Sequence, residues 1–493
     1  MKLSLHILFL LFLALASAFL LPSCIEDGFT DSPSDQPVFS VDTLHMGVIF
    51  TGEPSPTKRF VVHNPHSKQL SISRIIFAGD HPEYFRMNVD GISGHDFSGV
   101  EIRAKDSIFV FVETTLPEGG ASRPLDFDAT IEFTVNGVTS EVVVEAQGQD
   151  VVRMREVILE ADTRFTAEKP YQIFDSLVVA RGAVLTLEAG TQLCFHDGAS
   201  LVVRGTLLSE GTVDMPVNLS GDRTGNVVAD ISFDIMSRQW TGMFFTPTSR
   251  GNVLRHTDIR NTWQGVAVTG YVPESEEEDA VRSGTADASE PVLTMINCHL
   301  HNSGDLVLEA VHAGIKAVGC EFGEGGGGLV YLQGGSHSFN HCTFANYYLF
   351  SALGGPSVWL AHVSADEKTG ADDGSGLPYI SAEFGNCIIY GNGTDLSHGD
   401  LTGTDVYFRR CLLKSEGTDD DNFINCLWGE DPLYYTVRED YLFDSRLKPE
   451  SPAIGAADPA LTLPDAAIDA YGLARGTAPD LGAYVFMPPA EEE

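Results

Sequence analysis

The sequence has 493 residues, and its 30 Lys and Arg against 69 Asp and Glu give a formal net charge of −39. A charge of this size repels nucleic acid and anionic lipid headgroups, so both are excluded as expected ligands. The length suits two or three domains, and 49 glycines with 24 prolines fit a protein of many short strands and turns.

Residues 1–23 have the pattern of a secretory leader. Lys2 precedes an almost wholly apolar run, which ends in Leu21-Pro22-Ser23-Cys24. This ending resembles the lipobox of bacterial lipoproteins, which implies cleavage of the leader and lipidation of Cys24. A lipid on Cys24 would hold the chain on a membrane surface. A plain secretory signal and an N-terminal anchor helix are the alternatives.

The residues after Cys24 predict where the protein resides. Ile25-Glu26-Asp27 resembles the surface-export signal of Bacteroidetes lipoproteins, which implies the outer membrane and the cell surface, with the periplasmic face as the alternative. Residues 24–38 are polar and rich in Pro and Ser, and they predict a flexible tether. No later apolar run is long enough to span a bilayer.

Residues 39–150 predict an immunoglobulin-like β-sandwich. Short runs of alternating apolar and polar residues, such as 107–112 and 129–135, are separated by turn residues such as Asn136-Gly137. About seven such strands in roughly 110 residues are typical of this sandwich. The segment contains no catalytic cluster, and it resembles modules that space or dock a neighbouring domain in bacterial surface proteins.

Residues 151–440 predict a second, repetitive domain. Ser176-Leu177-Val178-Val179 returns 24 residues later as Ser200-Leu201-Val202-Val203, with glycine corners between short strands. Three short strands per period describe one coil of a parallel β-helix, which must stack on other coils to bury its apolar face. The pattern resembles the right-handed β-helix folds of pectate-lyase-like architecture. The expected fold class is therefore all-β, with an N-terminal Ig-like sandwich followed by a right-handed parallel β-helix.

Cysteines mark the later coils. Cys298, Cys320 and Cys342 lie 22 residues apart, and Cys387 and Cys411 lie 24 apart, each two positions before an apolar residue. A small residue repeated once per coil stacks on its predecessor inside the core. We therefore expect buried free thiols. Two alternatives are disulfides between coils and a zinc site with the neighbouring histidines His299, His301 and His341. Thr257 and Ala361 are expected to fill the same position in other coils.

Two acidic insertions interrupt the period, at residues 274–289 and 364–376. Insertions of this kind carry binding or catalytic groups in some proteins and are solvated loops in others. The sequence predicts no cofactor or metal site. Calcium is the possible exception, at Asp372-Asp373-Gly374 or Asp419-Asp420-Asp421, although neither has the spacing of an EF-hand loop.

Residues 441–493 form a distinctive tail. Ser451-Pro452-Ala453-Ile454-Gly455, Arg475 and Asp480-Leu481-Gly482-Ala483-Tyr484 resemble the C-terminal segment of β-helix surface proteins, with Gly455 where Asp is usual and Val485 where Glu is usual. The last coil of a stack exposes backbone groups and an apolar cross-section. The resemblance therefore predicts a cap on that coil.

Two functions remain open on the sequence alone. Exposed aromatic side chains could stack on sugar rings, although aromatic residues more often fill a core. The candidates are Trp240, Trp263, Tyr347, Tyr348 and Trp359. The favoured function is therefore a non-catalytic one, either binding of a polysaccharide or partner protein or a structural role. The lipid would hold the protein on the membrane.

The alternative is a polysaccharide lyase or glycoside hydrolase. It requires a groove with a basic residue close to carboxylates of shifted pKa. The basic residues of the repeats are scattered along the sequence, and no known catalytic motif accompanies them. The sequence therefore identifies no catalytic residue.

Overall fold

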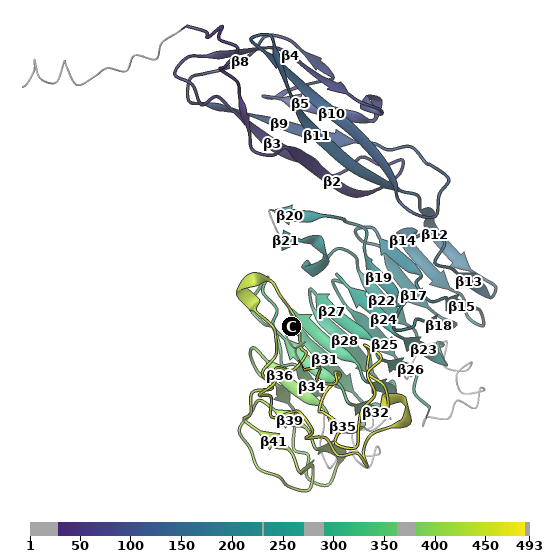
Figure 1. The fold of residues 1–493 in the computed structure, drawn as a ribbon. Helices are drawn as coiled ribbons and strands as arrows, with labels where there is room; N and C mark the ends of the chain where they lie inside the picture. Colours follow the sequence, from purple (N-terminus) through teal and green to yellow (C-terminus); the bar gives the residue numbers. More distant parts are fainter. Residues whose placement is uncertain (1–27, 229–230, 271–289, 362–379, 489–493) are drawn as a thin grey trace, which may run out of the picture. The chain divides into compact units, whose positions relative to one another are not determined.

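A computed structural model describes residues 28–228, 231–270, 290–361 and 380–488 (Figure 1). The chain divides after Asp150 into two units. Both are built of β-strands, with only short 3-10 turns beside them, so the prediction of an all-β chain is confirmed. Cys24, both acidic insertions and the Asp372-Asp373-Gly374 segment lie outside the described residues. Among the residues that are described, no helix has the length and apolar character needed to cross a membrane.

The first unit consists of two facing sheets. The five-stranded sheet has the order β1 (Val38–Phe39), β3 (Lys58–His63), β9 (Ser107–Thr114), β5 (Phe85–Val89) and β6 (Ile92–Gly94). The other sheet has the order β2 (Thr43–Phe50), β11 (Val138–Gln149), β10 (Leu125–Val135), β4 (Leu70–Ala78) and β7 (Asp96–Phe97), and β8 (Val100–Ile102) also pairs with β4. Alternate residues of each strand point inward, and Phe60 and Phe133 meet edge to face across the core, with ring centroids 6.1 Å apart.

The turn between β10 and β11 is the one that its sequence predicts. Val135 pairs with Val138, which leaves Asn136 and Gly137 as a two-residue loop, and both have positive φ angles of 50° and 80°. Asn-Gly is favoured in such hairpins because these two residues tolerate the left-handed backbone conformation best.

The second unit consists of three rows of parallel strands. The chain passes through the rows in turn and returns to each row about once per period. The first row contains β16 (Gln192–Phe195), β19 (Val217–Gly221), β24 (Thr257–Arg260), β27 (His299–Ser303), β30 (Glu321–Gly325), β33 (Thr343–Asn346), β36 (Ile388–Gly391), β39 (Leu412–Leu413) and β41 (Leu427–Trp428). The second row contains β17 (Ser200–Val203), β22 (Gly242–Phe245), β25 (Val266–Thr269), β28 (Leu306–Val311), β31 (Gly328–Gln333), β34 (Val358–Ala361) and β37 (Leu396–Ser397).

Rows one and two join through a long strand at the start of the unit. β14 (Tyr171–Val179) pairs with β16 by its first half and with β17 by its second, and β12 (Val152–Leu159) pairs with β14. Ser176 lies directly opposite Ser200, so the 24-residue repeat of the sequence is the register of the strands. The third row is a separate sheet of β13 (Thr163–Phe165), β15 (Val184–Leu187), β18 (Thr206–Glu210), β23 (Asn252–Arg255), β26 (Leu293–Ile296), β29 (Ile315–Val318), β32 (Gly335–Asn340), β35 (Ile380–Gly385), β38 (Asp405–Arg409) and β40 (Phe423–Ile424).

The short remaining elements lie outside the rows. They are the antiparallel pair β20 (Asn226–Val228) and β21 (Ile231–Ser232), and the 3-10 turns η1 (Pro82–Tyr84), η2 (Phe233–Ile235), η4 (Arg438–Asp440) and η5 (Pro464–Ala466).

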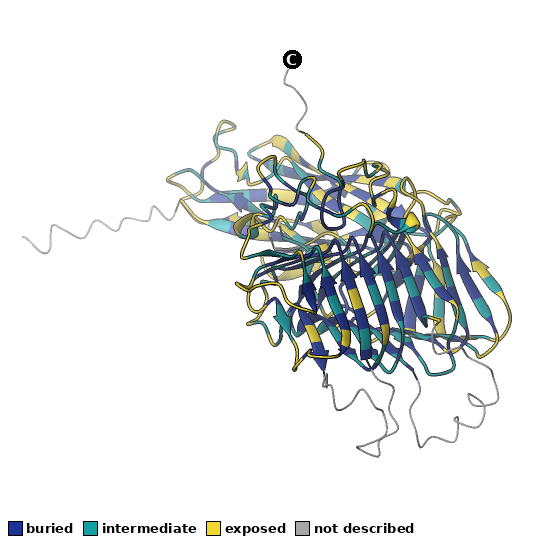
Figure 2. Cartoon of the chain, turned by 90° about the horizontal axis from the view of Figure 1, so that it is seen from below, coloured by how far each residue is buried: buried dark blue, intermediate teal, exposed yellow. Residues whose placement is uncertain are grey.

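Buried residues recur along successive strands of the second unit (Figure 2), and their side chains form one apolar core. Phe339, Phe384, Phe408 and Phe423 form a column with ring centroids 4.9, 4.6 and 4.8 Å apart and nearly parallel planes. Their separation equals the usual distance between neighbouring strands, because parallel strands in register place like residues above one another. The column therefore follows directly from the repeat in the sequence.

The cysteines occupy a second repeated position in this core. The described cysteines are free, and all except Cys426 are buried, as the sequence predicts for core thiols. Cys194 lies within β16, and each of the others follows a corner residue with positive φ, for example Asn297 before Cys298 and Asn386 before Cys387. Thr257 fills the same position, but Ala361 does not, because it ends β34 in the second row and pairs with Gln333. Within the described ranges, no three His, Cys, Asp or Glu side chains gather so as to hold a metal ion.

The C-terminal tail corrects the expectation of an end cap. It lies along the side of the second unit, against the corners that precede the first row (Figure 1). The side-chain amides of Asn386, Asn340 and Asn297 donate hydrogen bonds to the backbone oxygens of Asp458, Leu461 and Ile468, at 2.9, 2.9 and 3.2 Å. The tail therefore runs back towards earlier strands, because asparagines at three levels of the stack, two of them at corners and Asn340 just before one, offer polar groups to a segment lying beside them.

Candidate functional site

Two of the predicted sugar-stacking residues are buried. Trp240 is only 1% exposed, its ring stacks on Phe195 with centroids 4.1 Å apart, and its indole N–H donates to the backbone oxygen of Arg260 at 2.7 Å. Tyr348 is also buried, and its hydroxyl is hydrogen-bonded to Ser237. Neither ring has a face open to a ligand, because each fills space beside or within the stacked strands.

The other three predicted residues lie on different parts of the second unit. Tyr347 is partly buried beside Tyr434, and burial raises the pKa of its hydroxyl. Trp263 is 56% exposed in the segment between β24 and β25, with the guanidinium of Arg238 5.9 Å from its ring. Trp359 is 42% exposed on β34. The five candidates therefore do not form one site. Of the exposed ones, Trp359 is the one that packs against another aromatic ring, that of Tyr331.

Trp359 belongs to a row of polar and aromatic side chains on the outward face of the second row. It lies opposite Tyr331 on β31, which in turn lies opposite Glu309 on β28. The rings of Trp359 and Tyr331 meet at 87° with centroids 5.1 Å apart, and the Tyr331 hydroxyl donates to Gln333 Oε1 at 2.9 Å. We name Glu309, Tyr331, Gln333 and Trp359 the aromatic strip.

The chemistry of the aromatic strip suits an uncharged polar ligand with an apolar face. The two rings offer an apolar surface, and the amide and carboxyl beside them offer hydrogen bonds. Partial burial, and then the nearby Asp305, raise the pKa of Glu309. Burial likewise raises the pKa of Tyr331, with Glu309 adding to the shift. Neighbouring levels repeat at about 4.8 Å, so the strip can contact consecutive units of a linear polymer.

A cluster of charged residues lies on the outward face of the first row. Arg260 on β24 lies opposite His301 on β27, and Asp258 accepts a hydrogen bond from the Arg260 guanidinium at 2.8 Å. The imidazole Nε2 of His301 is 3.4 Å from the other oxygen of Asp258, and its Nδ1 is 3.0 Å from the amide of Asn302. We name Asp258, Arg260, His301 and Glu324 the charged cluster.

Glu324 is the unusual member of this cluster. It is 6% exposed and lies within β30, directly after Gly323, with a φ of 49°. Among the described residues, none makes a hydrogen bond to its carboxyl group. Burial raises its pKa to about 8, against the opposing effect of His301. The side chain therefore carries a proton at neutral pH.

The other members of the charged cluster have pKa values shifted towards their charged forms. Burial alone would raise the pKa of Asp258, but His301 and Arg260 lower it below its ordinary value. For His301 burial acts to lower the pKa, and the attraction of Asp258 outweighs it, so the net shift is upward. A buried carboxyl with a raised pKa thus lies near Asp258, His301 and Arg260, whose pKa values are shifted towards their charged forms, and this arrangement can donate and hold protons.

Two segments border the charged cluster. On one side, Asp234 of η2 pairs with Arg260 at 3.4 Å, and its backbone oxygen accepts hydrogen bonds from Asn261 and Asn302. On the other side, the tail residue Tyr484 is hydrogen-bonded to His299 and to Glu321. Glu321 is engaged by the tail, so it does not belong to the available acid–base groups.

Sequence reasoning missed most of these residues. Asp258 pairs in register with His299, yet the two lie 41 positions apart because the segment 271–289 intervenes between their coils. The sequence marks His301 only as a zinc alternative with His299 and His341, Arg260 is one of the scattered basic residues, and nothing in the local sequence marks Glu324. The alignment of Thr257 with Cys298 already places Asp258 beside His299 and Arg260 beside His301, and this alignment is the signal that could have found the pairs.

Comparisons with known proteins do not assign the chain to a family. No protein-family model and no curated protein matches it. Solved structures give only partial matches. A family 123 glycoside hydrolase from Clostridium perfringens that acts on glycolipid glycans matches over 23% of this chain and 25% of its own, at 9% identity and a TM-score of 0.17. This chain thus covers only a quarter of that hydrolase.

Two further structures match to a similar extent. The PapD-like domain 7 of human CEP192 matches over 27% of this chain and 97% of its own, at 12% identity and a TM-score of 0.18. A protein of unknown function from Porphyromonas gingivalis W83 matches over 26% and 60%, at 13% identity and a TM-score of 0.18. Scores this low carry no argument about fold or function.

Proposed function

We propose that the chain is a lipid-anchored surface protein of the outer membrane, in which an Ig-like sandwich precedes a right-handed parallel β-helix that binds a glycan. The two facing sheets of the first unit and the three parallel rows of the second support this fold. The apolar leader ending at Cys24 supports the anchor. Binding takes place on the aromatic strip.

The observation that carries this proposal is the pair Trp359 and Tyr331. Outward faces of strands normally carry polar side chains, whereas here two large rings meet at the surface with an amide and a carboxyl beside them. Such a surface suits the C–H face and the hydroxyl groups of a pyranose. The net charge of −39 favours neutral over acidic glycans, because it repels anions.

Replacement of Trp359 tests the aromatic strip. Trp359→Ala removes the larger ring, and an aromatic contact of about 0.5–1.5 kcal/mol corresponds to a roughly 2- to 12-fold weaker affinity. Binding of the chain from residue 25 onward is measured on immobilised plant, host and bacterial glycans. Trp263→Ala is the matched control, because Trp263 is exposed but lies off the strip. Equal glycan binding by wild type and Trp359→Ala would refute the strip as the binding surface.

The charged cluster favours a second function, cleavage of a glycosidic bond. Protonated Glu324 could donate its proton to the leaving oxygen while a water molecule adds to the sugar carbon and loses its proton to solvent. The observation that favours this function is the buried carboxyl beside the Asp258–His301 pair. New oligosaccharides on chromatography after incubation with the same glycans, absent with Glu324→Gln, support it. An intact panel with wild-type protein excludes it for those glycans.

A further inference from the structure

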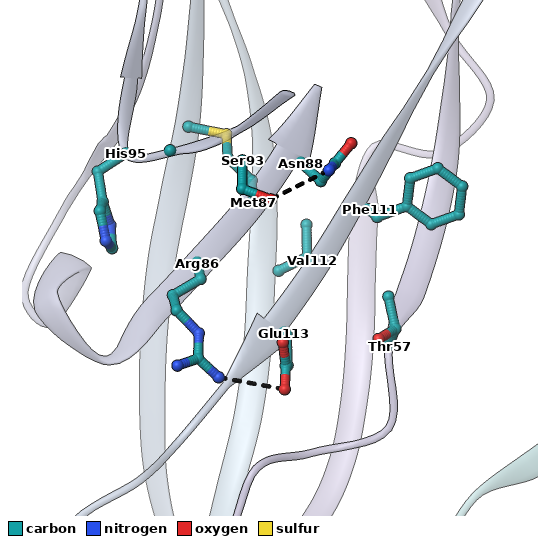
Figure 3. A pocket seen from close by; sticks show the side chains of 10 residues that line it. Thr57, Arg86, Met87, Asn88, Ser93, His95, Phe111, Val112 and Glu113 are labelled. Atoms are coloured by element: carbon teal, nitrogen blue, oxygen red, sulfur yellow. Dashed lines mark hydrogen bonds and ion pairs between the residues drawn. The ribbon is translucent and has the colours of Figure 1, made fainter. Parts of the chain in front are cut away.

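The five-stranded sheet of the first unit carries a hollow on its outward face, beside β5, β6 and β9 (Figure 3). Its volume is about 540 Å³, within the range of about 300–1,000 Å³ typical of small-ligand sites. The side chains that matter for recognition are Thr57, Arg86, Asn88, Ser93, Phe111 and Glu113. The aromatic strip and the charged cluster both belong to the other unit, so this hollow is a separate feature.

The register of the strands places an aromatic ring among polar groups. Phe111 points outward from β9, between the buried Val110 and Val112. On the adjacent strand β5 it lies opposite Asn88, and Asn88 in turn lies opposite Ser93 on β6. A ring, an amide and a hydroxyl therefore lie side by side across three strands.

The polar groups of the hollow are held in place by the protein. The Asn88 side-chain oxygen accepts a hydrogen bond from the backbone N–H of Gly91 at 2.9 Å, and its amide nitrogen donates to the Ser93 hydroxyl at 3.1 Å. Arg86 pairs with Glu113 at 3.1 Å on adjacent strands (Figure 3). Groups that are already ordered lose little conformational entropy when a ligand binds.

The ion pair between Arg86 and Glu113 adds little to the stability of the fold. A pair at the surface stabilises a fold by only about 0–1 kcal/mol, because water screens the charges. Arg86 and Glu113 offer a donor and an acceptor that neutralise each other, so the hollow as a whole selects neither anions nor cations. A second ring on this face, Phe109, is 43% exposed and lies under the guanidinium of Arg59, 5.1 Å from the ring.

We propose that this hollow binds a neutral pyranose unit of a glycan, with the sugar ring on Phe111 and its hydroxyl groups bonded to Asn88, Arg86 and Glu113. An extended peptide fits less well, because the hollow lies on the face of the sheet, and the edge strands β1 and β6 have only two and three residues. The first unit is then a binding module with a ligand site of its own. This proposal is independent of the function proposed for the second unit.

Glycan-array binding tests the proposal. Variants of the full mature chain are measured on neutral gluco-, galacto- and manno-oligosaccharides and on their uronic acid counterparts. Phe111→Ala and Asn88→Ala are expected to lower the signal for at least one neutral glycan by about 3- to 10-fold, whereas Phe111→Tyr keeps a ring and retains it. Phe109→Ala is the matched control, on the same strand and face but outside the hollow. Unchanged unfolding midpoints show that all variants are folded.

The outcomes separate this proposal from that for the aromatic strip. The same series is measured in the Trp359→Ala background, so that a glycan bound by both units still reports on Phe111. An array profile that Phe111→Ala leaves unchanged overturns the inference, and so does a loss confined to acidic glycans. Loss with Phe111→Ala but not with Trp359→Ala supports the hollow and overturns the strip. A wild-type chain that binds no glycan on the array overturns both.

Discussion

At the scale of single residues, Glu324 shows how a buried position determines ionisation. An ordinary glutamate is charged above pH 5, but this carboxyl is 6% exposed and receives no hydrogen bond from any described residue. A buried charge without hydrogen bonds costs more free energy than a neutral acid in the same place. The protein therefore keeps a proton on Glu324 in the folded state and releases it when it unfolds.

This difference predicts a pH dependence of stability that Glu324→Gln removes in part. The folded pKa of about 8 lies above the unfolded value of 4.5, so the folded state binds the extra proton between these pH values. Stability should therefore fall as pH rises from 4.5 to 8, by up to about 4 kcal/mol if the whole shift is realised. Gln is neutral throughout, so the variant should lack this slope.

The measurement is denaturant unfolding of wild type and Glu324→Gln at pH 5, 6, 7 and 8. The raised pKa of His301 also makes stability fall with pH, because its stabilisation is present below pH 6.5 and is lost as pH rises through the folded pKa. The variant is therefore expected to keep a shallower slope. Parallel curves for the two proteins would contradict a raised pKa at Glu324.

At the scale of elements, the corners before the first row organise both the core and the tail. From His256 to Arg410 these corner residues adopt the left-handed conformation, and the residue after each is a buried Cys or Thr. At the corners Asn297 and Asn386 the side-chain amide bonds to the tail backbone, and Asn340, the residue before the corner residue His341, does the same. The tail thus depends on a repeat that the sequence shows only as Asn-Cys dipeptides.

Asn386→Gly should loosen the tail without straining the corner. Gly accepts the φ of 57°, but it lacks the amide that donates to Asp458 O at 2.9 Å and the oxygen that accepts from Asp458 N at 2.8 Å. Two hydrogen bonds of about 0.5–1.5 kcal/mol each predict a loss of about 1–3 kcal/mol. Faster hydrogen exchange over residues 456–484 measures it. Asn425→Gly, at the corresponding corner before Cys426, is the control and should leave the tail unchanged.

The predictable parts of the structure are those that repeat in the sequence. Ser176 opposite Ser200, the buried thiols and the Asn136-Gly137 hairpin follow from local spacing, because a parallel register or a two-residue turn leaves a local signature. The charged cluster depends on pairs from coils separated by an insertion. The course of the tail depends on contacts more than 70 residues apart, such as Asn386 with Asp458. Burial of Trp240 depends on Phe195 in an earlier coil. No window of sequence contains these contacts.

At the scale of the whole molecule, the proposed anchor determines which ligands the protein can reach. A chain with a net charge of −39 is repelled by anionic lipid headgroups, so it needs a covalent lipid to remain at a membrane. A lipidated Cys24 would supply it. Residues 28–38, expected to belong to a flexible tether, are instead bonded to the first unit: Phe29 bridges to Gln69, and the Gln36 amide donates to the backbone oxygen of Val135 at 3.1 Å. The lipid would therefore hold the first unit close to the bilayer. Both proposed glycan sites would then be presented outside the cell.

Cys24→Ser tests this arrangement in the native cells. The wild-type chain is expected in the detergent phase of a Triton X-114 partition and to be cleaved by protease added to intact cells. The variant lacks the thiol that carries the lipid, so it should move to the aqueous phase. A wild-type chain found in the aqueous phase would instead indicate a plain secretory signal. A variant that stays in the detergent phase would indicate an uncleaved anchor helix, because its attachment does not need the thiol. Wild-type protein that is lipidated but protected from the protease would place the anchor on the periplasmic face, and there both units could meet only glycans that have already crossed the outer membrane.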